Sequence, residues 1–228
     1  MTFSQRTAAL IAGASLLAMA AIAGFGYGYA FQHLYVANDV ATTVKNFTAS
    51  PILARGFIAS FVAILILDVV VAWALYLFFE PIHKRWSLLA TLLRIVYAPL
   101  LGIALLPVMF ALNLLRHSDF LNHLQYDNLV MENIRTFMDV WSMGLIVFGC
   151  HLGVVGYLML RPLAKIPKIL GTLMLLAAVC YIATNTAHLL MPNYELYQAR
   201  IDEVLSLPMA LGELGLAVWL LAKGGKES

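Results

Sequence analysis

The chain has 228 residues, of which 62% are hydrophobic and only 11% are charged, and its mean hydropathy is +0.87. Soluble domains carry roughly a quarter charged residues, so a soluble fold could not bury this much apolar surface and the lipid bilayer is the expected solvent. The net charge of +2, with no long basic run, argues against a nucleic-acid partner.

Six apolar segments approach the roughly 20 residues that a helix needs to cross about 30 Å of hydrocarbon. They cover residues 7–31, 55–79, 87–115, 137–160, 167–191 and 204–222. Each should be a helix, because a helix satisfies its own backbone hydrogen bonds in lipid and none of the segments alternates like a barrel strand. The sequence predicts an all-α membrane protein, with six transmembrane helices in a single domain spanning residues 1–228.

The basic residues predict the orientation of this bundle. One side would hold eight of them, in the turns "EPIHKRW" and "RPLAKIPK" and at the two termini, and the other side five. Lysine and arginine are enriched in cytoplasmic loops, so both termini should be cytoplasmic. Between the first two spans, Asp39 is a predicted N-cap for an amphipathic helix whose apolar face includes Val44 and Phe47.

Ionisable side chains within the spans are the main functional signal. Such residues are costly in lipid and usually face the interior of a bundle. At 1.5 Å per residue, the side chains of Asp68, Arg94, His151 and Glu213 all lie roughly 10–17 Å from the cytoplasmic end. Asp139 and His188 lie roughly 30 Å from that end, near the outer surface. The sequence predicts an inner polar cluster of four residues and an outer pair.

The pairing within the inner cluster is open at this stage. Arg94 needs a carboxylate, which either Glu213 or Asp68 could supply, and the other acid would then be left to His151 or to a proton. One alternative is a static latch between Arg94 and Glu213, with His151 bonded to a backbone carbonyl. The small residues Gly149 and Gly153 predict that the helix around His151 packs closely on another helix.

Four stretches together resemble a known family: "LLRIVYAPLLG", "VFGCHLGVVGYL", "IPKILGTLMLLAAVCYIATNTAHLLMPNY" and "LPMALGELGLAVWLL". In this order and spacing they are similar to a bacterial membrane family defined as domain of unknown function 4386. The family pattern has an arginine where Arg94 stands, histidines where His151 and His188 stand, and a glutamate where Glu213 stands. The resemblance implies six helices in a bacterial inner membrane, and no reaction.

Three functions fit these observations. The first is a small-solute or proton-linked carrier, in which the buried arginine could hold an anionic solute or lipid. The second is a non-catalytic component that binds a lipid or a partner protein, with the cluster as a structural latch. The third is an intramembrane enzyme that uses His151 and a carboxylate, but no GxSxG motif and no third metal ligand accompany them. No catalytic residue, metal or cofactor is assigned, and the oligomeric state is left open.

Overall fold

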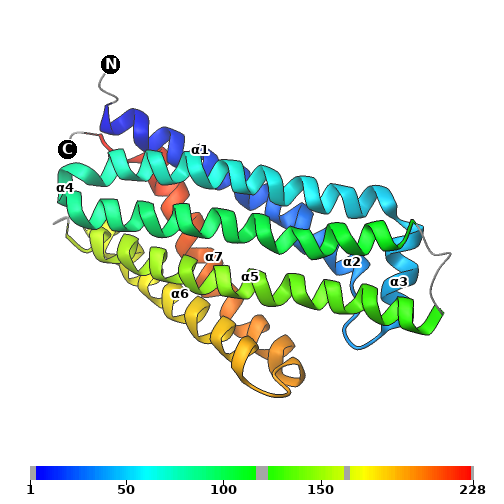
Figure 1. Ribbon diagram of the computed structural model, residues 1–228. Coiled ribbons are helices and arrows are strands. Elements are labelled where there is room, and N and C mark those ends of the chain that lie inside the picture. Colours follow the sequence, from blue (N-terminus) through cyan, green and yellow to red (C-terminus); the bar gives the residue numbers. More distant parts are fainter. Residues whose placement is uncertain (1–3, 117–122, 162–164, 227–228) are drawn as a thin grey trace.

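A computed structural model describes residues 4–116, 123–161 and 165–226 of the chain, and in these residues it contains helices and no strands (Figure 1). The helices are α1 (Gln5–Ala23), the π-helix η1 (Gly24–Phe31), α2 (Gln32–Leu34), α3 (Val40–Ala49), α4 (Pro51–Leu114), α5 (His123–Met159), α6 (Lys165–Leu190) and α7 (Glu195–Ala222). Four helical segments are long and apolar enough to cross a membrane, and Met209–Ala222 is a shorter apolar helix. The predicted all-α membrane-protein fold is confirmed.

Helix α4 contains two of the predicted spans. Its backbone leaves helical geometry at His83 (φ −162°, ψ 97°), within the predicted turn "EPIHKRW", so that two long arms lie side by side (Figure 1). Other helices exceed their predicted apolar segments. The segment predicted at 137–160 belongs to α5, which begins at His123, and the segment predicted at 204–222 belongs to α7, which begins at Glu195. Hydropathy finds only the apolar part of a helix, whereas the backbone hydrogen bonds continue into its polar ends.

The long helices pack in a closed ring. Both α1 and α5 pack on α4, α6 packs on α5, and α7 packs between α6 and α1. The two termini lie at the same end of the bundle (Figure 1). At that end Arg6 closes the ring, because its guanidinium donates to the carbonyl oxygens of Leu220, Leu221 and Gly224 at 2.6–3.0 Å. These carbonyls at the C-terminal end of α7 have no partner within their own helix, and a basic side chain supplies one.

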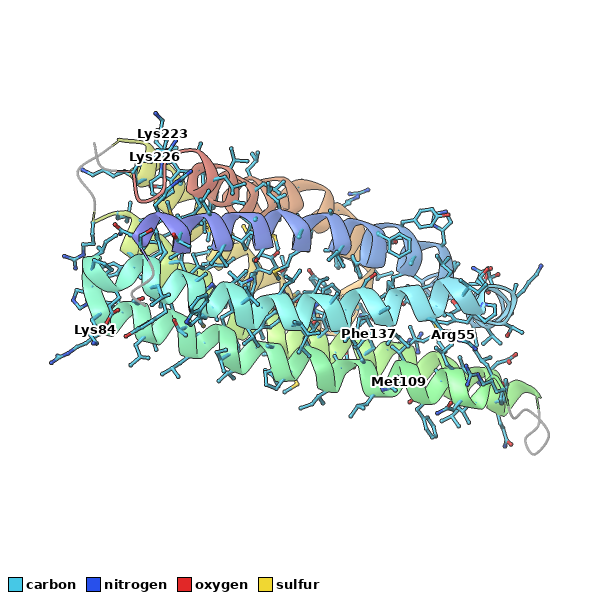
Figure 2. All side chains as sticks on the ribbon, turned by 90° about the horizontal axis from the view of Figure 1, so that it is seen from above. Arg55, Lys84, Met109, Phe137, Lys223 and Lys226 are labelled. Carbon is cyan, nitrogen blue, oxygen red and sulfur yellow. The ribbon has the colours of Figure 1, made fainter. Side chains whose placement is uncertain are left out.

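Helices α1, η1 and α2 form one continuous helical segment, Gln5–Leu34, which we call the first helical rod. Aromatic side chains fix its outer half. A cluster of stacked and edge-to-face rings joins η1 to the first arm of α4 and to α5, and consists of Tyr27, Phe31, Phe57, Phe61, Phe137 and Trp141. Adjacent rings lie 4.6–5.6 Å apart between centroids, within the range in which aromatic pairs attract. Phe137 lies beside the first arm of α4 in Figure 2.

Two local predictions are confirmed. Asp39 caps α3, because its carboxylate accepts a hydrogen bond from the Thr42 amide at 2.9 Å, and Phe47 of α3 is buried. The capping bonds lower the pKa of Asp39 from its ordinary value. Helix α5 approaches α6 through glycines: a Cβ on Gly149 would lie 2.8 Å from Ile182, and one on Gly156 would lie 2.8 Å from a carbonyl oxygen of α6.

Candidate functional site

A buried arginine lies at the centre of the bundle. Arg94 is on the second arm of α4, and its side chain is 2% exposed. Its Nε and Nη2 donate to Asp68 Oδ1 on the first arm, at 2.9 and 2.7 Å. Nη2 also lies 3.7 Å from the sulfur of Met19 on α1. Because a buried charge must be paired, this contact ties the two arms of α4 together deep in the membrane.

The same guanidinium supplies a partner for His151, the histidine within the apolar stretch "GCHLGVVGYL". Arg94 Nη1 lies 3.2 Å from Nε2 of His151, and Nδ1 of His151 lies 2.8 Å from the carbonyl oxygen of Ala90. A guanidinium can only donate, so Nε2 accepts and Nδ1 carries the proton that is donated to the carbonyl. Both ring nitrogens are therefore occupied. His151 joins α5 to α4, and neither nitrogen is free to bind a metal or accept a proton from a substrate.

Only one oxygen of Asp68 takes part in this network. Oδ1 accepts both bonds from Arg94, while Oδ2 is buried and has no hydrogen-bond partner among the described residues. A buried acceptor without a partner costs roughly 1–3 kcal/mol. The residue also lines the cavity described below, so a ligand or water with a hydrogen-bond donor could satisfy this oxygen.

Glu213 lies on α7, apart from the arginine network. Its Oε1 accepts a hydrogen bond from the hydroxyl group of Tyr181 on α6, at 2.8 Å. The latch weighed from the sequence, between Arg94 and Glu213, is not the pairing found, because Asp68 occupies the guanidinium instead. Asp68 is the partner because the two arms of α4 lie side by side. Depth along the helices could not distinguish Asp68 from Glu213, because both lie at a depth that Arg94 can reach.

The predicted outer pair lies together. Nε2 of His188 on α6 is 3.1 Å from Oδ1 of Asp139 on α5. The His188 side chain is 13% exposed and that of Asp139 is 58% exposed. The ring of Tyr194 packs edge-on against His188. The pair therefore joins α5 and α6 near the outer end of the bundle.

A cavity of about 1000 Å³ occupies the centre of the helical ring and is open on one side. Its size is at the upper end of the range for small-molecule sites, roughly 300–1,000 Å³. Three of the four predicted inner residues line it, Asp68, Arg94 and Glu213, and His188 lines its outer part; His151 lies behind Arg94 and does not line it. Most of the other lining residues are apolar or aromatic, and the polar ones are Gln32, Ser142, Thr184 and Asn185.

One wall of the cavity is made of small residues from the first helical rod: Ala20, Ala23, Gly24 and Gly28. A Cβ built on Gly24 or Gly28 would meet no atom within 4 Å, so these glycines border open space. Within the described residues η1 packs mainly on α4 and shows no comparable packing with α7. Since Met209, Ala210 and Leu214 of α7 line the opposite wall, the open side lies between η1 and α7.

Sequence reasoning missed several parts of this site. Tyr181, Tyr97 and Trp141 line the cavity, but as aromatic residues in apolar segments they give no distinguishing pattern. The π-helix η1 was also missed, although "GFGYGYAF" has three glycines in eight residues. π-helical segments occur often at functional sites. Among the described residues, His, Cys, Asp and Glu side chains form no group of three that could hold a metal.

Comparisons with known proteins agree with this architecture. The sequence profile of the domain of unknown function DUF4386 matches residues 11–224. The chain belongs to this family. An uncharacterized protein of Archaeoglobus fulgidus is 30% identical over 165 residues, which are 72% of this chain and 82% of that protein. No solved structure matches the chain. The DUF4386 family has a helical, membrane-like architecture and no assigned activity, so the function has to be argued from the cavity.

Proposed function

We propose that this DUF4386 protein binds a small amphiphilic solute in the central cavity and carries it in the membrane. The observation that carries the proposal is the cavity itself, which has a volume of about 1000 Å³ and opens between η1 and α7. It is lined by the side chains of Asp68, Arg94 and Glu213. A bundle that needed these groups only for packing would fill the space around them, since protein interiors are close-packed. Apolar walls with a few polar groups are typical of small-molecule sites.

The two halves of the inner cluster have different roles in this proposal. Arg94, Asp68 and His151 form a fixed framework, because nearly all their polar atoms bond to one another or to backbone. Glu213 of α7 and Tyr181 of α6 line the cavity outside that framework, and in this proposal they are the groups that meet the solute. Glu213 can therefore bind and release a proton while the network around Arg94 stays unchanged.

The open side indicates how the solute enters. Leu211 of α7 is 51% exposed and Tyr29 of η1 is 50% exposed, so both helices also carry large exposed side chains with apolar surface. In a bilayer these side chains face lipid, and a solute with an apolar body would enter sideways between η1 and α7. The glycines of η1 leave room for this passage.

We also propose that the protein is embedded in a bacterial inner membrane with both termini in the cytoplasm. Lys84, Lys223 and Lys226 lie at one end of the bundle and Arg55 at the other (Figure 2). The end that carries the termini holds the larger number of basic residues, which supports a cytoplasmic position for it.

Native mass spectrometry of protein released from its own membranes tests the binding proposal. Gly24→Leu adds a side chain at a position that lines the cavity, where its Cβ would meet no atom within 4 Å. Ala18→Leu adds a leucine side chain at an exposed position of α1 that does not line the cavity. We expect wild type and Ala18→Leu to retain a small bound species, and Gly24→Leu to lose it while remaining folded. Equal retention in all three proteins would refute a cavity site.

A second candidate is a non-catalytic membrane component whose polar cluster only fixes the helices. It is favoured by one observation: the guanidinium of Arg94 contacts α1, α5 and both arms of α4. It predicts that any bound lipid or partner is retained equally by wild type and Gly24→Leu, that Gly24→Leu accumulates like wild type, and that Arg94→Ala fails to accumulate.

A further inference from the structure

The charges around the cavity are not balanced within the protein. The guanidinium of Arg94 is matched by the carboxylate of Asp68, which accepts two of its N–H groups. Glu213 has no cationic partner among the described residues, and its one hydrogen bond comes from the neutral hydroxyl of Tyr181. Around the inner cluster the cavity therefore offers two acids and one base, while His188, at the outer part of the cavity, pairs with Asp139.

The remaining acceptors point in the same direction. Asp68 Oδ2 is buried beside the cavity without a donor in the described part of the chain. An anionic solute would face this oxygen and Glu213, while four of the five N–H groups of Arg94 are directed at Asp68, His151 and Met19. A cationic solute would meet acceptors instead of repulsion. The geometry thus favours a cation over the anionic solute expected from the sequence.

The walls define the rest of the solute. Seven aromatic side chains line the cavity: Tyr27, Phe61, Tyr97, Trp141, Phe148, Tyr181 and Tyr194. A cation is attracted to the face of such rings, and several rings beside a carboxylate are a known way to recognise organic cations. The Phe148 ring already lies 5.3 Å from Cζ of Arg94, so contacts to a bound cation would come from the other rings of the wall.

Resting on the proposed binding function, we infer that the solute is a lipophilic organic cation that exchanges with a proton on Glu213. A carboxylate in apolar surroundings is costly unless a proton or a cation neutralises it. In the empty protein a proton neutralises the carboxylate of Glu213. When the cation binds, that proton is released to solvent. The titratable or charged groups that line the cavity with Glu213 are Arg94, Asp68 and Tyr97 of α4, Tyr181 and His188 of α6, Tyr194 just before α7 and Tyr27 of η1. The described lining residues of α5 carry none. Of these groups, Tyr181 is the one that hydrogen-bonds Glu213, and His188 pairs with Asp139. Glu213 is thus the group on which proton and cation compete.

Two probes of the same shape and opposite charge test this inference. Tetraphenylphosphonium and tetraphenylborate would be titrated by calorimetry into the full-length protein in lipid nanodiscs, in two buffers of different ionisation enthalpy. We expect saturable binding of tetraphenylphosphonium with release of about one proton, since binding displaces the proton held by one carboxyl group. We expect no comparable binding of tetraphenylborate.

Variants locate the exchange at Glu213. Glu213→Gln should weaken tetraphenylphosphonium binding at least about tenfold and abolish proton release, because it removes a desolvated charge pair. Glu213→Asp keeps the carboxylate, and should therefore keep both tetraphenylphosphonium binding and proton release. Glu80→Gln, a carboxylate at the surface near the turn of α4, is the matched control and should behave as wild type. The thermal unfolding midpoint of each variant separates loss of binding from loss of fold.

The outcomes separate the two proposals. Unchanged tetraphenylphosphonium binding in Glu213→Gln, or binding without proton release, overturns the exchange at Glu213. Binding of tetraphenylborate that Gly24→Leu abolishes overturns the cation preference but leaves the cavity as a binding site. Failure of wild type to bind either probe overturns the cation inference, and the bound species seen by mass spectrometry then decides the proposed function on its own.

Discussion

Removing either partner of the buried ion pair should destabilise the protein far more than removing both. In Asp68→Leu the guanidinium of Arg94 keeps only His151 and the Met19 sulfur, and in Arg94→Met the carboxylate of Asp68 loses every described donor. Breaking a buried pair from one side costs about 3–5 kcal/mol. In the double variant no charge is left, and the main remaining defect is the acceptor at Nε2 of His151, which costs about 1–3 kcal/mol.

Thermal unfolding in detergent, followed by tryptophan fluorescence, measures this difference. For a chain of this size each kcal/mol shifts the midpoint by roughly 2–4 °C, so each single variant should unfold roughly 6–20 °C below wild type. The double variant should recover a large part of that loss. Glu80→Gln, which removes the carboxylate of a surface pair, should hardly move the midpoint. A double variant that loses as much as the two single variants added together would refute the coupling between Asp68 and Arg94.

Three further predictions concern the ends and contacts of the helices. Arg6→Gln should cost about 1–3 kcal/mol and speed hydrogen exchange at the end of α7, because three carbonyl groups lose a charged donor; an unchanged exchange rate would contradict the capping role. Gly156→Ala should lower the unfolding midpoint by forcing α5 and α6 apart, since its Cβ would lie 2.8 Å from a backbone oxygen, whereas Gly153→Ala, with 3.6 Å to its nearest neighbour, should be neutral; equal shifts in the two variants would count against this packing. The pKa of Asp39 is lowered in the folded protein, so its contribution to α3 is complete above the ordinary value of 3.8 and is lost as the pH falls through the lower folded value. Hydrogen exchange of α3, corrected for the intrinsic rate, should therefore speed up below about pH 4, and a rate that did not depend on pH in this range would contradict it.

Sequence alone determined the class of the protein and the depth of its polar groups. Apolar length identifies membrane helices because the bilayer has a fixed thickness, and helical rise converts residue number into depth. This reasoning grouped Asp68, Arg94 and Glu213 before any contact was known, and the three line one cavity. Capping by Asp39 was predictable for a similar reason, since it depends on neighbours three residues away.

Only the tertiary structure decided which of these groups meet. Depth does not fix the rotation of a helix about its axis, so Glu213 and Asp68 were equivalent partners for Arg94 until the two arms of α4 packed side by side. The role of His151 depended on that choice, because its acceptor nitrogen needs the guanidinium that Asp68 holds in place. The cavity and its opening beside η1 depended on how α1 with η1, the two arms of α4, α5, α6 and α7 pack around a common space. No stretch of sequence carries that information by itself.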